Sequence, residues 1–419
     1  MTGAPDGKCR GSHAAAERIA MNNERISAAA AKSIAEAYRD FPATSRWTYM
    51  DVAARSVWPS CVRQAIDRYL DDRMVNGGDK ARMFEMIEET RRRFAGLVNA
   101  DPDEIAFTKN ISEGLNIVAN SAGLQAGDNV VLCPELEHPN NVYPWLNLRR
   151  FGVEVRAVPA KGSAISVPDM LARVDERTRI VVASSVTFAP GFRTDIDSLG
   201  RNCRERGILF VVDGAQSIGV LATDVQRSCI DAMAVSTQKG LLGFYGMGFL
   251  FCRRACAERM QPAYLARFGV DLGDAHEASM GGFEFRLQPS ARRFDLGNYN
   301  FLAAAAANSS MEYLMSFGAE TIEDYVVGLA HRMAGGLLDL GFPVCGGVPG
   351  AHLAHIVSVG DLGAGGHDST QDPRFSALYK RLTDHGVRLS IRRGILRFSL
   401  HLYNTAADVE RVLDLVAKK

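Results

Sequence analysis

The chain has 419 residues, of which 47% are hydrophobic and 23% charged, as in ordinary globular proteins. Its 48 basic and 48 acidic residues cancel, so we expect no nucleic-acid partner, because such proteins carry a strong basic bias or patch. No apolar run reaches the roughly 18 residues of a membrane span, and residues 1–20 lack the apolar core of a secretion signal. We therefore expect a cytoplasmic protein with no membrane segment.

The N-terminal part of the chain is predicted to be mainly helical. Residues 1–21 are expected to be disordered, and the alanine-rich stretch 22–40 to form a helix within a segment (22–45) that joins a small domain. An extended segment over 46–57 follows. Apolar residues at helical spacing then predict two helices, over 59–72 and 80–99.

Strands and helices alternate in the middle of the chain. This alternation predicts βαβ units and an α/β fold with a mostly parallel sheet, with helices on both faces. Ser112 and Glu113 fit the residue types that begin a helix after the first strand. The expected large domain covers 46–298, with helices at 140–150, 167–175 and 195–206 and seven strands at 105–108, 129–133, 153–158, 179–185, 208–213, 231–236 and 247–252.

A smaller α+β domain is expected over 299–419. It begins with a long helical pattern over 301–340, after an irregular stretch in which 271–286 is a candidate lid or specificity loop. The pairs His352/His355 and Arg392/Arg393 are interpreted as packing and surface charge rather than substrate contacts. Eight scattered cysteines show no metal-binding spacing and are interpreted as free thiols.

An acidic and a basic side chain lie at or just after the ends of two predicted strands. Asp213 closes the apolar run ILFVVD, and the run ending at Ser236 is followed by Lys239. Ligands of open α/β sheets bind beyond the carboxyl ends of the strands, so both groups should face one crevice. An acid and an amine in that place indicate pyridoxal phosphate, with Lys239 as its Schiff-base partner and Asp213 on the pyridinium nitrogen.

Several motifs lie between Tyr49 and the C-terminus. They are FTKNISEGLNIVA (107–119), ELEHPNNVYPW (135–145), SSVTFAPGFRTDI (184–196), VVDGAQSIG (211–219), STQKGLLGFYGMGFLF (236–251), FDLGNYNF (294–301) and LRFSLHLYNT (396–405). The series resembles that of the class V aminotransferases and cysteine desulfurases, which are fold-type I pyridoxal-phosphate enzymes. Together the motifs are specific for the family and much less specific for the reaction.

The resemblance implies a role for each matching residue, with pyridoxal 5′-phosphate as cofactor. Lys239 would form the Schiff base and carry the substrate Cα proton, and Asp213 would keep the ring nitrogen protonated. His138 would lie over the ring, with Gln216 near its 3-oxygen. Arg397 would bind the α-carboxylate of a small amino-acid substrate. The phosphate would be held by Ile111, Ser112, Ser236 and Gln238.

The family also implies a homodimer with shared active sites, because Asn298 lies where a partner residue reaches the phosphate.

The sequence departs from the family pattern at three places that bear on the reaction. Residues 385–400 have no cysteine where desulfurases carry the persulfide-forming one, so we expect no desulfurase activity. Phe188 replaces an asparagine that contacts the ring oxygen, and Gln238 replaces a histidine. The last two features resemble isopenicillin N epimerase-like proteins and carbon–sulfur lyases.

Three reactions share this cofactor after the Cα proton is removed: side-chain elimination, transamination and epimerisation. His138, at a position where many transaminases carry an aromatic ring, favours side-chain cleavage of a cysteine-like amino acid. A class V aminotransferase is the first alternative. An amino-acid epimerase and a catalytically silent relative that only binds the cofactor are the others.

Overall fold

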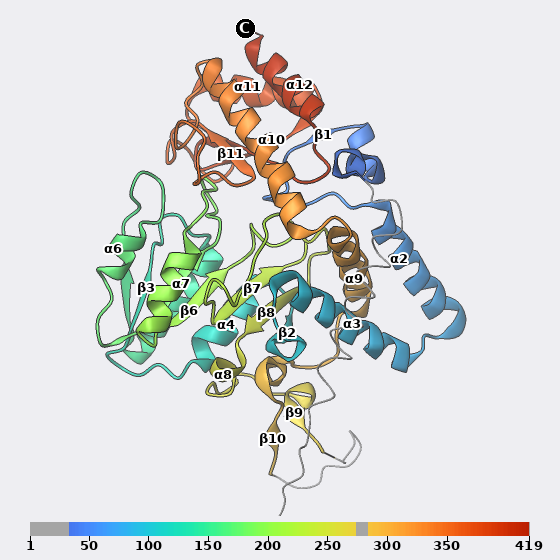
Figure 1. Cartoon of the computed structure of the whole chain (residues 1–419), viewed down its shortest axis with the longest axis vertical. Coiled ribbons are helices and arrows are strands. Elements are labelled where there is room, and N and C mark those ends of the chain that lie inside the picture. The colour runs from blue at the N-terminus through green and yellow to red at the C-terminus, as the bar shows by residue number, and fades with distance from the viewer. Residues whose placement is uncertain (1–32, 274–283, 419) are drawn as a thin grey trace, which may run out of the picture.

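The structure is a computed structural model that describes residues 33–273 and 284–418. The stretch 1–21, most of the helix expected over 22–40, and the centre of the candidate lid therefore lie outside the described residues. The described start of the chain forms the 3-10 helices η1 (Ile34–Asp40) and η2 (Pro42–Ser45). Strand β1 (Thr48–Tyr49) then pairs in parallel with β12 (Val387–Arg388), so this segment lies against the C-terminal region (Figure 1).

A seven-stranded sheet forms the centre of the molecule, as predicted (Figure 1). Its strand order is β2-β8-β7-β6-β5-β3-β4, and β8 runs antiparallel to both of its neighbours while the other pairs are parallel. Every predicted boundary is within one residue. The strands are β2 (Ile105–Thr108), β3 (Asn129–Leu132), β4 (Glu154–Ala157), β5 (Thr178–Ser184), β6 (Leu209–Asp213), β7 (Ala232–Ser236) and β8 (Gly248–Cys252).

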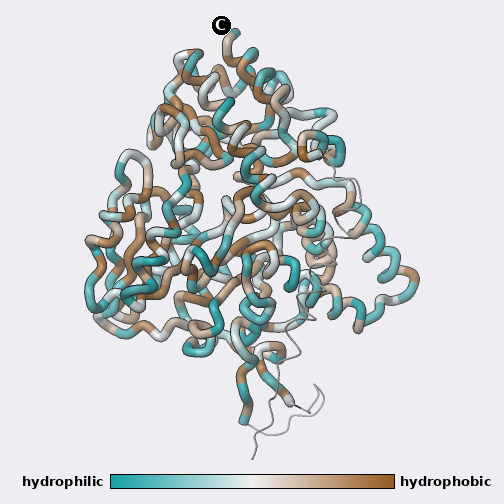
Figure 2. Tube along the Cα trace, in the orientation of Figure 1, coloured by the Kyte–Doolittle hydropathy of each residue, from teal (hydrophilic) through white to brown (hydrophobic). Residues whose placement is uncertain are grey.

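Both faces of the sheet are buried, and successive strand residues belong to different cores. Val131 and Val212 lie in one core with residues of α3 (Lys80–Val98) and α7 (Ile196–Glu205). Val130 and Val211 lie in the other with residues of α4 (Ile111–Ser121). Figure 2 shows hydrophobic residues concentrated along these strands. Because neither face of the central strands meets water, β6, β7 and β8 are nearly continuous apolar runs, whereas the edge strand β4 (EVRA) is partly exposed and carries charged residues.

The remaining helices between residues 59 and 175 differ in part from prediction. The helix expected over 140–150 is divided among three short elements, because Pro144 has no N–H to continue the hydrogen-bond pattern. The one expected over 167–175 ends at Leu171. The other elements are α2 (Ser60–Asp71), η3 (Asp72–Asn76), η4 (Pro102–Glu104), η5 (Pro139–Asn141), α5 (Tyr143–Asn147), η6 (Leu148–Phe151) and α6 (Val167–Leu171).

The stretch 253–296 contains several short elements, including a two-stranded hairpin. These are α8 (Arg254–Ala257), η7 (Arg267–Gly269), β9 (Val270–Asp271), β10 (Arg286–Leu287) and η8 (Ser290–Phe294). The helix expected over 301–340 is two helices, α9 (Phe301–Met315) and α10 (Ala319–Asp339). The break falls at Gly318, whose φ of +83° lies in the left-handed region that interrupts a helix.

The C-terminal region combines helices with a second sheet of order β11-β14-β13. Helices α10 and α12 pack against each other beside it (Figure 1). The elements are β11 (Ile356–Val359), α11 (Pro373–Asp384), β13 (Ser390–Arg392), β14 (Ile395–Ser399) and α12 (Ala406–Ala417).

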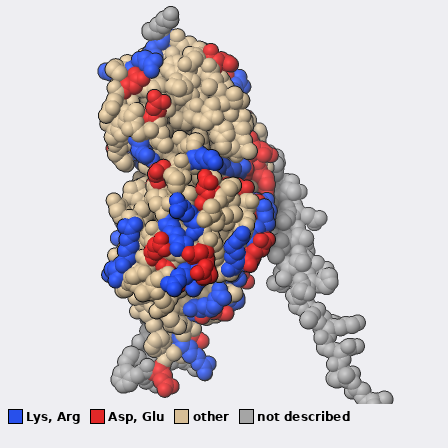
Figure 3. Space-filling view, turned by 90° about the vertical axis from the view of Figure 1, so that its left-hand side faces the viewer, with Lys and Arg blue, Asp and Glu red and all other residues tan. Residues whose placement is uncertain are grey.

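Charged residues of both signs are interspersed on the face in Figure 3, in line with the balanced composition. Within residues 33–273 and 284–418, no helix is both long and apolar enough to cross a membrane. The same residues contain no group of three His, Cys, Asp or Glu side chains arranged to hold a metal ion.

Candidate active site

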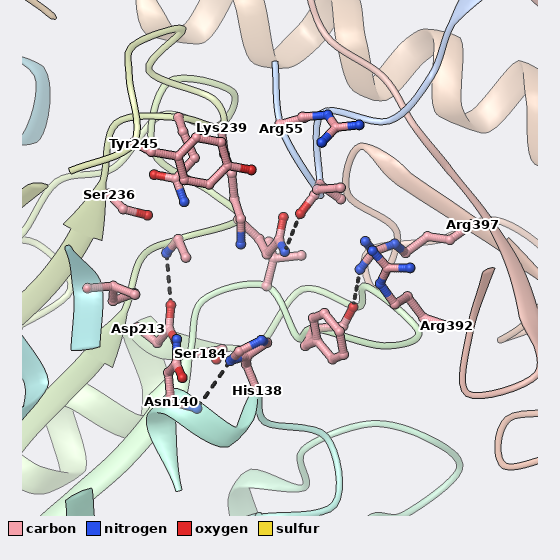
Figure 4. Close-up of a pocket in the computed structure, with 18 of the residues that line it drawn as sticks. Arg55, His138, Asn140, Ser184, Asp213, Ser236, Lys239, Tyr245, Arg392 and Arg397 are labelled. Atoms are coloured by element: carbon pink, nitrogen blue, oxygen red, sulfur yellow. Dashed lines mark hydrogen bonds between the residues drawn. The ribbon is translucent and has the colours of Figure 1, made fainter. Parts of the chain in front are cut away.

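A cavity of about 330 Å³ lies at the carboxyl ends of the parallel strands, where side chains from the C-terminal region also enter it (Figure 4). Ser112 and Asn298 do not line it, and Asn298 is exposed. The structure thus brings together eight of the ten residues predicted for the site: Ile111, His138, Asp213, Gln216, Ser236, Gln238, Lys239 and Arg397.

Asp213 and Lys239 face the cavity from neighbouring strands. Asp213 is the last residue of β6 and is only 5% exposed, and its Oδ1 accepts a hydrogen bond of 2.9 Å from the N–H of Ala215. Burial raises the pKa of Asp213 and lowers the pKa of Lys239 to about 8, against the opposing effect of the Asp213 charge. A lower pKa increases the fraction of the lysine that is a neutral, nucleophilic amine near neutral pH.

The loop that carries Lys239 is held by close backbone packing and by the C-terminal region. A Cβ on Gly240 would lie 2.3 Å from the carbonyl oxygen of Ile218, so only glycine permits this approach. His401 accepts from the N–H of Leu402 at Nδ1 (2.7 Å) and donates from Nε2 to the Gly240 carbonyl (2.9 Å). Burial lowers the pKa of His401 to about 4, so the ring stays neutral and keeps this tautomer.

His138 lies opposite Lys239 across the cavity (Figure 4). Its Nδ1 accepts a hydrogen bond of 3.1 Å from the N–H of Asn140, so the proton of the neutral ring is on Nε2. The ring meets Phe188 edge to face, with centroids 4.8 Å apart. Burial and the nearby Lys239 lower the pKa of His138 to about 4, which keeps it neutral.

Glu137, the residue before His138, is buried next to the site and forms hydrogen bonds with residues around it. Its Oε1 accepts from the backbone N–H of Ser184 (2.7 Å) and its Oε2 from Asn141 Nδ2 (2.8 Å), while the Ser184 hydroxyl also bonds to Oε2. Burial, with the negative charge of Asp213, raises the pKa of Glu137 to about 7. Sequence reasoning missed this residue, although it stands beside His138 in a motif that had been singled out.

The raised pKa of Glu137 predicts a pH-dependent difference in stability. The folded protein retains a proton that the unfolded chain loses, so this group's contribution to the free energy of unfolding falls as pH rises from about 4.5 to about 7. Glu137→Gln stays neutral throughout. The variant should therefore gain up to roughly 3 kcal/mol relative to wild type between pH 5 and pH 8. Urea unfolding at both pH values tests this, with the exposed Glu135→Gln as control; a pH-independent difference would contradict it.

The end of the cavity near α4 is built to accept an anion. Asn110 caps this helix, and its Oδ1 accepts from the N–H of Glu113 (3.0 Å), while Ser112 lies in the first turn. A Cβ on Gly114 would lie 2.9 Å from that of Ala234, so glycine allows α4 to pack closely on β7. The free N–H groups at the helix start therefore lie near the carboxyl end of that strand. Ile111, Ser236 and Gln238 line this end.

Arg397 occupies a different part of the cavity wall and is fully buried. It donates to the carbonyl oxygen of Phe188 from Nη1 (2.7 Å) and to Ser390 Oγ from Nε (3.3 Å). The centre of its guanidinium is 5.2 Å from the Phe188 ring, a cation–π contact. Burial and the nearby Arg392 lower its pKa to about 10, so Arg397 remains charged at neutral pH.

Phe188 therefore packs against both His138 and Arg397, and its ring should support substrate binding. Phe188→Leu keeps the backbone carbonyl that Arg397 binds but removes the cation–π contact, which is worth roughly 0.5–2 kcal/mol. We expect KM to rise about 2- to 30-fold, with the visible absorption of the bound cofactor unchanged. Phe192→Leu is the matched control. Phe192 meets the ring of His352 edge to face, with ring centroids 4.9 Å apart, close to the 4.8 Å of the Phe188–His138 pair, and it does not line the cavity. Equal effects of the two variants would contradict a local role.

The model of the aminotransferase class-V family matches residues 48–412. The chain belongs to this family. A probable cysteine desulfurase of Methanothermobacter thermautotrophicus is 30% identical to it over 386 residues, covering 89% of this chain and 94% of that protein. Class V aminotransferases use pyridoxal 5′-phosphate, so this chain is a pyridoxal-phosphate enzyme.

Solved structures of similar proteins establish the fold, which is that of the fold-type I pyridoxal-phosphate enzymes. A cysteine desulfurase from Thermococcus onnurineus NA1, solved in its apo form, superposes with a TM-score of 0.77 at 24% identity, covering 91% of this chain and 96% of that one. The cystine C–S lyase C-DES was solved in complex with its reaction product cysteine persulfide. It superposes with a TM-score of 0.79 at 20% identity, covering 90% of this chain and 99% of that one.

Buried polar atoms in the cavity fit a class V aminotransferase with its cofactor and substrate. Within the described residues, Ser236 Oγ, Gln216 Oε1 and Arg397 Nη2 are buried without a hydrogen-bond partner. The Gln216 amide is oriented by its Nε2, which donates to the carbonyl of Ala53 (3.1 Å). Since buried polar groups in proteins are almost always paired, these atoms mark places where a bound molecule supplies the partner.

The cavity also contains residues that the sequence did not predict for the site. Arg392 lines it whereas Arg393 does not, so the interpretation of this pair as surface charge is wrong for Arg392. His352 and His355 do not line it. The further lining residues include Arg55, Ser184, Tyr245 and His367. Among the described residues that line the cavity there is no cysteine.

Proposed function

We propose that this enzyme cleaves the side chain of a small amino acid at Cβ, as a carbon–sulfur lyase does. The observation that carries the proposal is the state of His138. Its Nδ1 is occupied by the Asn140 N–H and its low pKa keeps it neutral, so the ring offers a single proton on Nε2. A neutral N–H placed in this way can donate a hydrogen bond that stabilises the negative charge developing on a leaving group.

The residues of the cavity fit the parts of such a reaction. When bound, pyridoxal phosphate supplies an electron sink for the negative charge that develops at Cα. Ser236, Gln238 and the first N–H groups of α4 would hold its phosphate, Asp213 its ring nitrogen, and Lys239 its aldehyde carbon. Arg397 would hold the substrate α-carboxylate through its unpartnered Nη2.

Two proton transfers complete the chemistry. The Lys239 amine takes the proton from Cα, and the ammonium so formed gives a proton to the leaving group as the Cβ bond breaks, while His138 Nε2–H donates a hydrogen bond to that group. Addition of water to the remaining three-carbon fragment yields pyruvate and ammonium. The products are therefore the protonated leaving group, pyruvate and ammonium, and no oxidant or second substrate is needed.

The cysteines argue for release of the leaving group over transfer of sulfur to the enzyme. No cysteine lines the described cavity. Cys345, the nearest cysteine in sequence to the substrate-binding arginine, bonds to the carbonyl of Gly360 (3.3 Å), and burial raises its pKa to about 12. A thiol with such a pKa is a poor nucleophile at neutral pH. Several relatives are named as cysteine desulfurases, but that activity is therefore not proposed for this chain.

Turnover without an acceptor tests the proposal. The holoenzyme is incubated with a panel of cysteine derivatives and other amino acids, with no 2-oxo acid present. A lyase releases pyruvate and ammonium over many turnovers, and His138→Gln slows this release. A class V aminotransferase, the second candidate because the family model carries that name, stops after one turnover until a 2-oxo acid is added. That result, or racemisation alone, would overturn the proposal.

A homodimer with shared active sites is part of the same proposal. Asn298 is exposed and does not line the cavity of its own chain, which suits a residue that reaches the phosphate in a partner's site. Mixing inactive Lys239→Ala and Asn298→Ala chains tests sharing, because exchange of subunits would restore activity in some sites. Absence of any recovery, with exchange demonstrated separately, would contradict it.

A further inference from the structure

The substrate end of the cavity carries more positive charge than one α-carboxylate neutralises. The lining of the whole cavity includes Arg55, Arg392 and Arg397, in addition to Lys239, and Arg392 and Arg397 lie at the substrate end. Asp213 is the one carboxylate among the described lining residues, and it serves the cofactor. Figure 4 shows Arg392 and Arg397 side by side, on the opposite side of the cavity from Ser236, where the phosphate is expected. The cofactor phosphate therefore does not account for these cations.

Arg392 and Arg397 are brought together by the second sheet. They lie on the paired strands β13 and β14, where Ser390 is opposite Arg397 and Arg392 opposite Ile395. Arg397 is fully buried, and repulsion from Arg392 contributes to its lowered pKa. Asp51 offsets part of that charge but does not line the cavity. Two adjacent guanidinium groups on one wall suit a ligand with two anionic groups.

Arg392 has a weak counter-ion that a ligand can replace. Its Nη1 binds Asp368, whose side chain is 69% exposed, and Asp368 also accepts from His367 at 2.9 Å. Arg392 itself is only 16% exposed, but Asp368 is well solvated, so releasing this carboxylate to water costs less than breaking an ion pair that is buried on both sides. A substrate anion inside the cavity, where water is partly excluded, competes well for the same guanidinium.

We propose that the substrate is an amino acid with a second anionic group on its side chain, such as a carboxylate. Arg397 binds the α-carboxylate, and Arg392 binds the side-chain anion as Asp368 withdraws. This inference rests on the proposed function only in taking an amino acid as the substrate, and it is independent of which bond is broken. It makes Arg392 the residue that determines specificity.

Binding of unreactive acids to the holoenzyme tests the proposal without turnover. Succinate and butyrate have the same number of carbons and differ by one carboxylate, and neither has an amine. Calorimetric titration should show succinate binding about tenfold more tightly than butyrate. Arg392→Gln should abolish this preference by weakening succinate alone. Arg393→Gln is the matched control, because Arg393 binds the carbonyl of Glu135 outside the cavity and should leave both affinities unchanged.

Variants of the loop and a pair of substrates extend the test. Asp368→Asn removes the competing carboxylate and should tighten succinate binding about threefold or more. S-carboxymethylcysteine should exceed its neutral amide, S-carbamoylmethylcysteine, in kcat/KM about tenfold, and Arg392→Gln should remove this difference.

Two results would overturn the inference. One is a wild-type holoenzyme that binds succinate and butyrate equally. The other is an Arg392→Gln variant that weakens both acids to the same extent, which would mean that the two arginines share a single carboxylate. Because these affinities involve no reaction, they stand apart from the proposed lyase activity. An aminotransferase that prefers acidic amino acids would support this inference while overturning the lyase.

Discussion

Replacing Lys239 with alanine should lower turnover by roughly 1,000-fold or more, because the variant loses both its bond to the cofactor and its general base. The amine lies in a cavity where burial lowers its pKa to about 8, and no other lysine lines the described wall. The backbone around it does not depend on the side chain, since the Lys239 carbonyl still accepts from the N–H of Leu242. Folding should therefore be preserved.

Three measurements on Lys239→Ala give the test. The variant should lack the visible absorption of a lysine-bound cofactor, should form no borohydride-stable adduct, and should keep its far-UV circular dichroism. Lys161→Ala, in which the altered side chain is 76% exposed, is the control and should behave as wild type. A Lys239→Ala protein that retains the absorption or the adduct would show that another residue carries the cofactor.

The fold was predictable because its signals are local. Both faces of the central strands are buried, so β6 and β7 are apolar runs that end in a polar residue, Asp213 and Ser236. Helix ends were predicted less well, because they depend on single glycine and proline residues and not on the hydrophobic pattern. Gly318 divides the predicted helix over 301–340, and Pro144 interrupts the one over 140–150.

The site was predictable only where strand ends or family motifs pointed to it. Eight of the ten predicted residues line one cavity, but their roles toward the cofactor remain predictions, as do those of Ser112 and Asn298. Arg392 was assigned to surface charge and His401 was not singled out, since both are brought to the cavity or its loop by the C-terminal region. Contacts between segments more than 150 residues apart leave no periodic pattern in the sequence.

Arg397→Lys should give the second largest effect, a fall in kcat/KM of roughly 100- to 1,000-fold for every amino acid that the enzyme accepts. Loss of one partner from a buried, hydrogen-bonded charge pair costs about 2–5 kcal/mol. Arg397 uses two of its nitrogens to hold its position, on Phe188 and Ser390, and leaves Nη2 for the substrate. A lysine has one nitrogen and cannot do both.

Steady-state kinetics with acidic and neutral amino acids check this expectation. Because the α-carboxylate is common to all of them, Arg397→Lys should weaken all of them similarly, whereas Arg392→Gln should affect only the acidic ones. Arg388→Lys is the control. Arg388 is exposed, the centre of its guanidinium lies 3.7 Å from the centre of the Trp47 ring, and it does not line the cavity. If Arg397→Lys leaves kcat/KM within a few-fold of wild type, the α-carboxylate is bound elsewhere, and the assignment of the second anion to Arg392 loses its geometric basis.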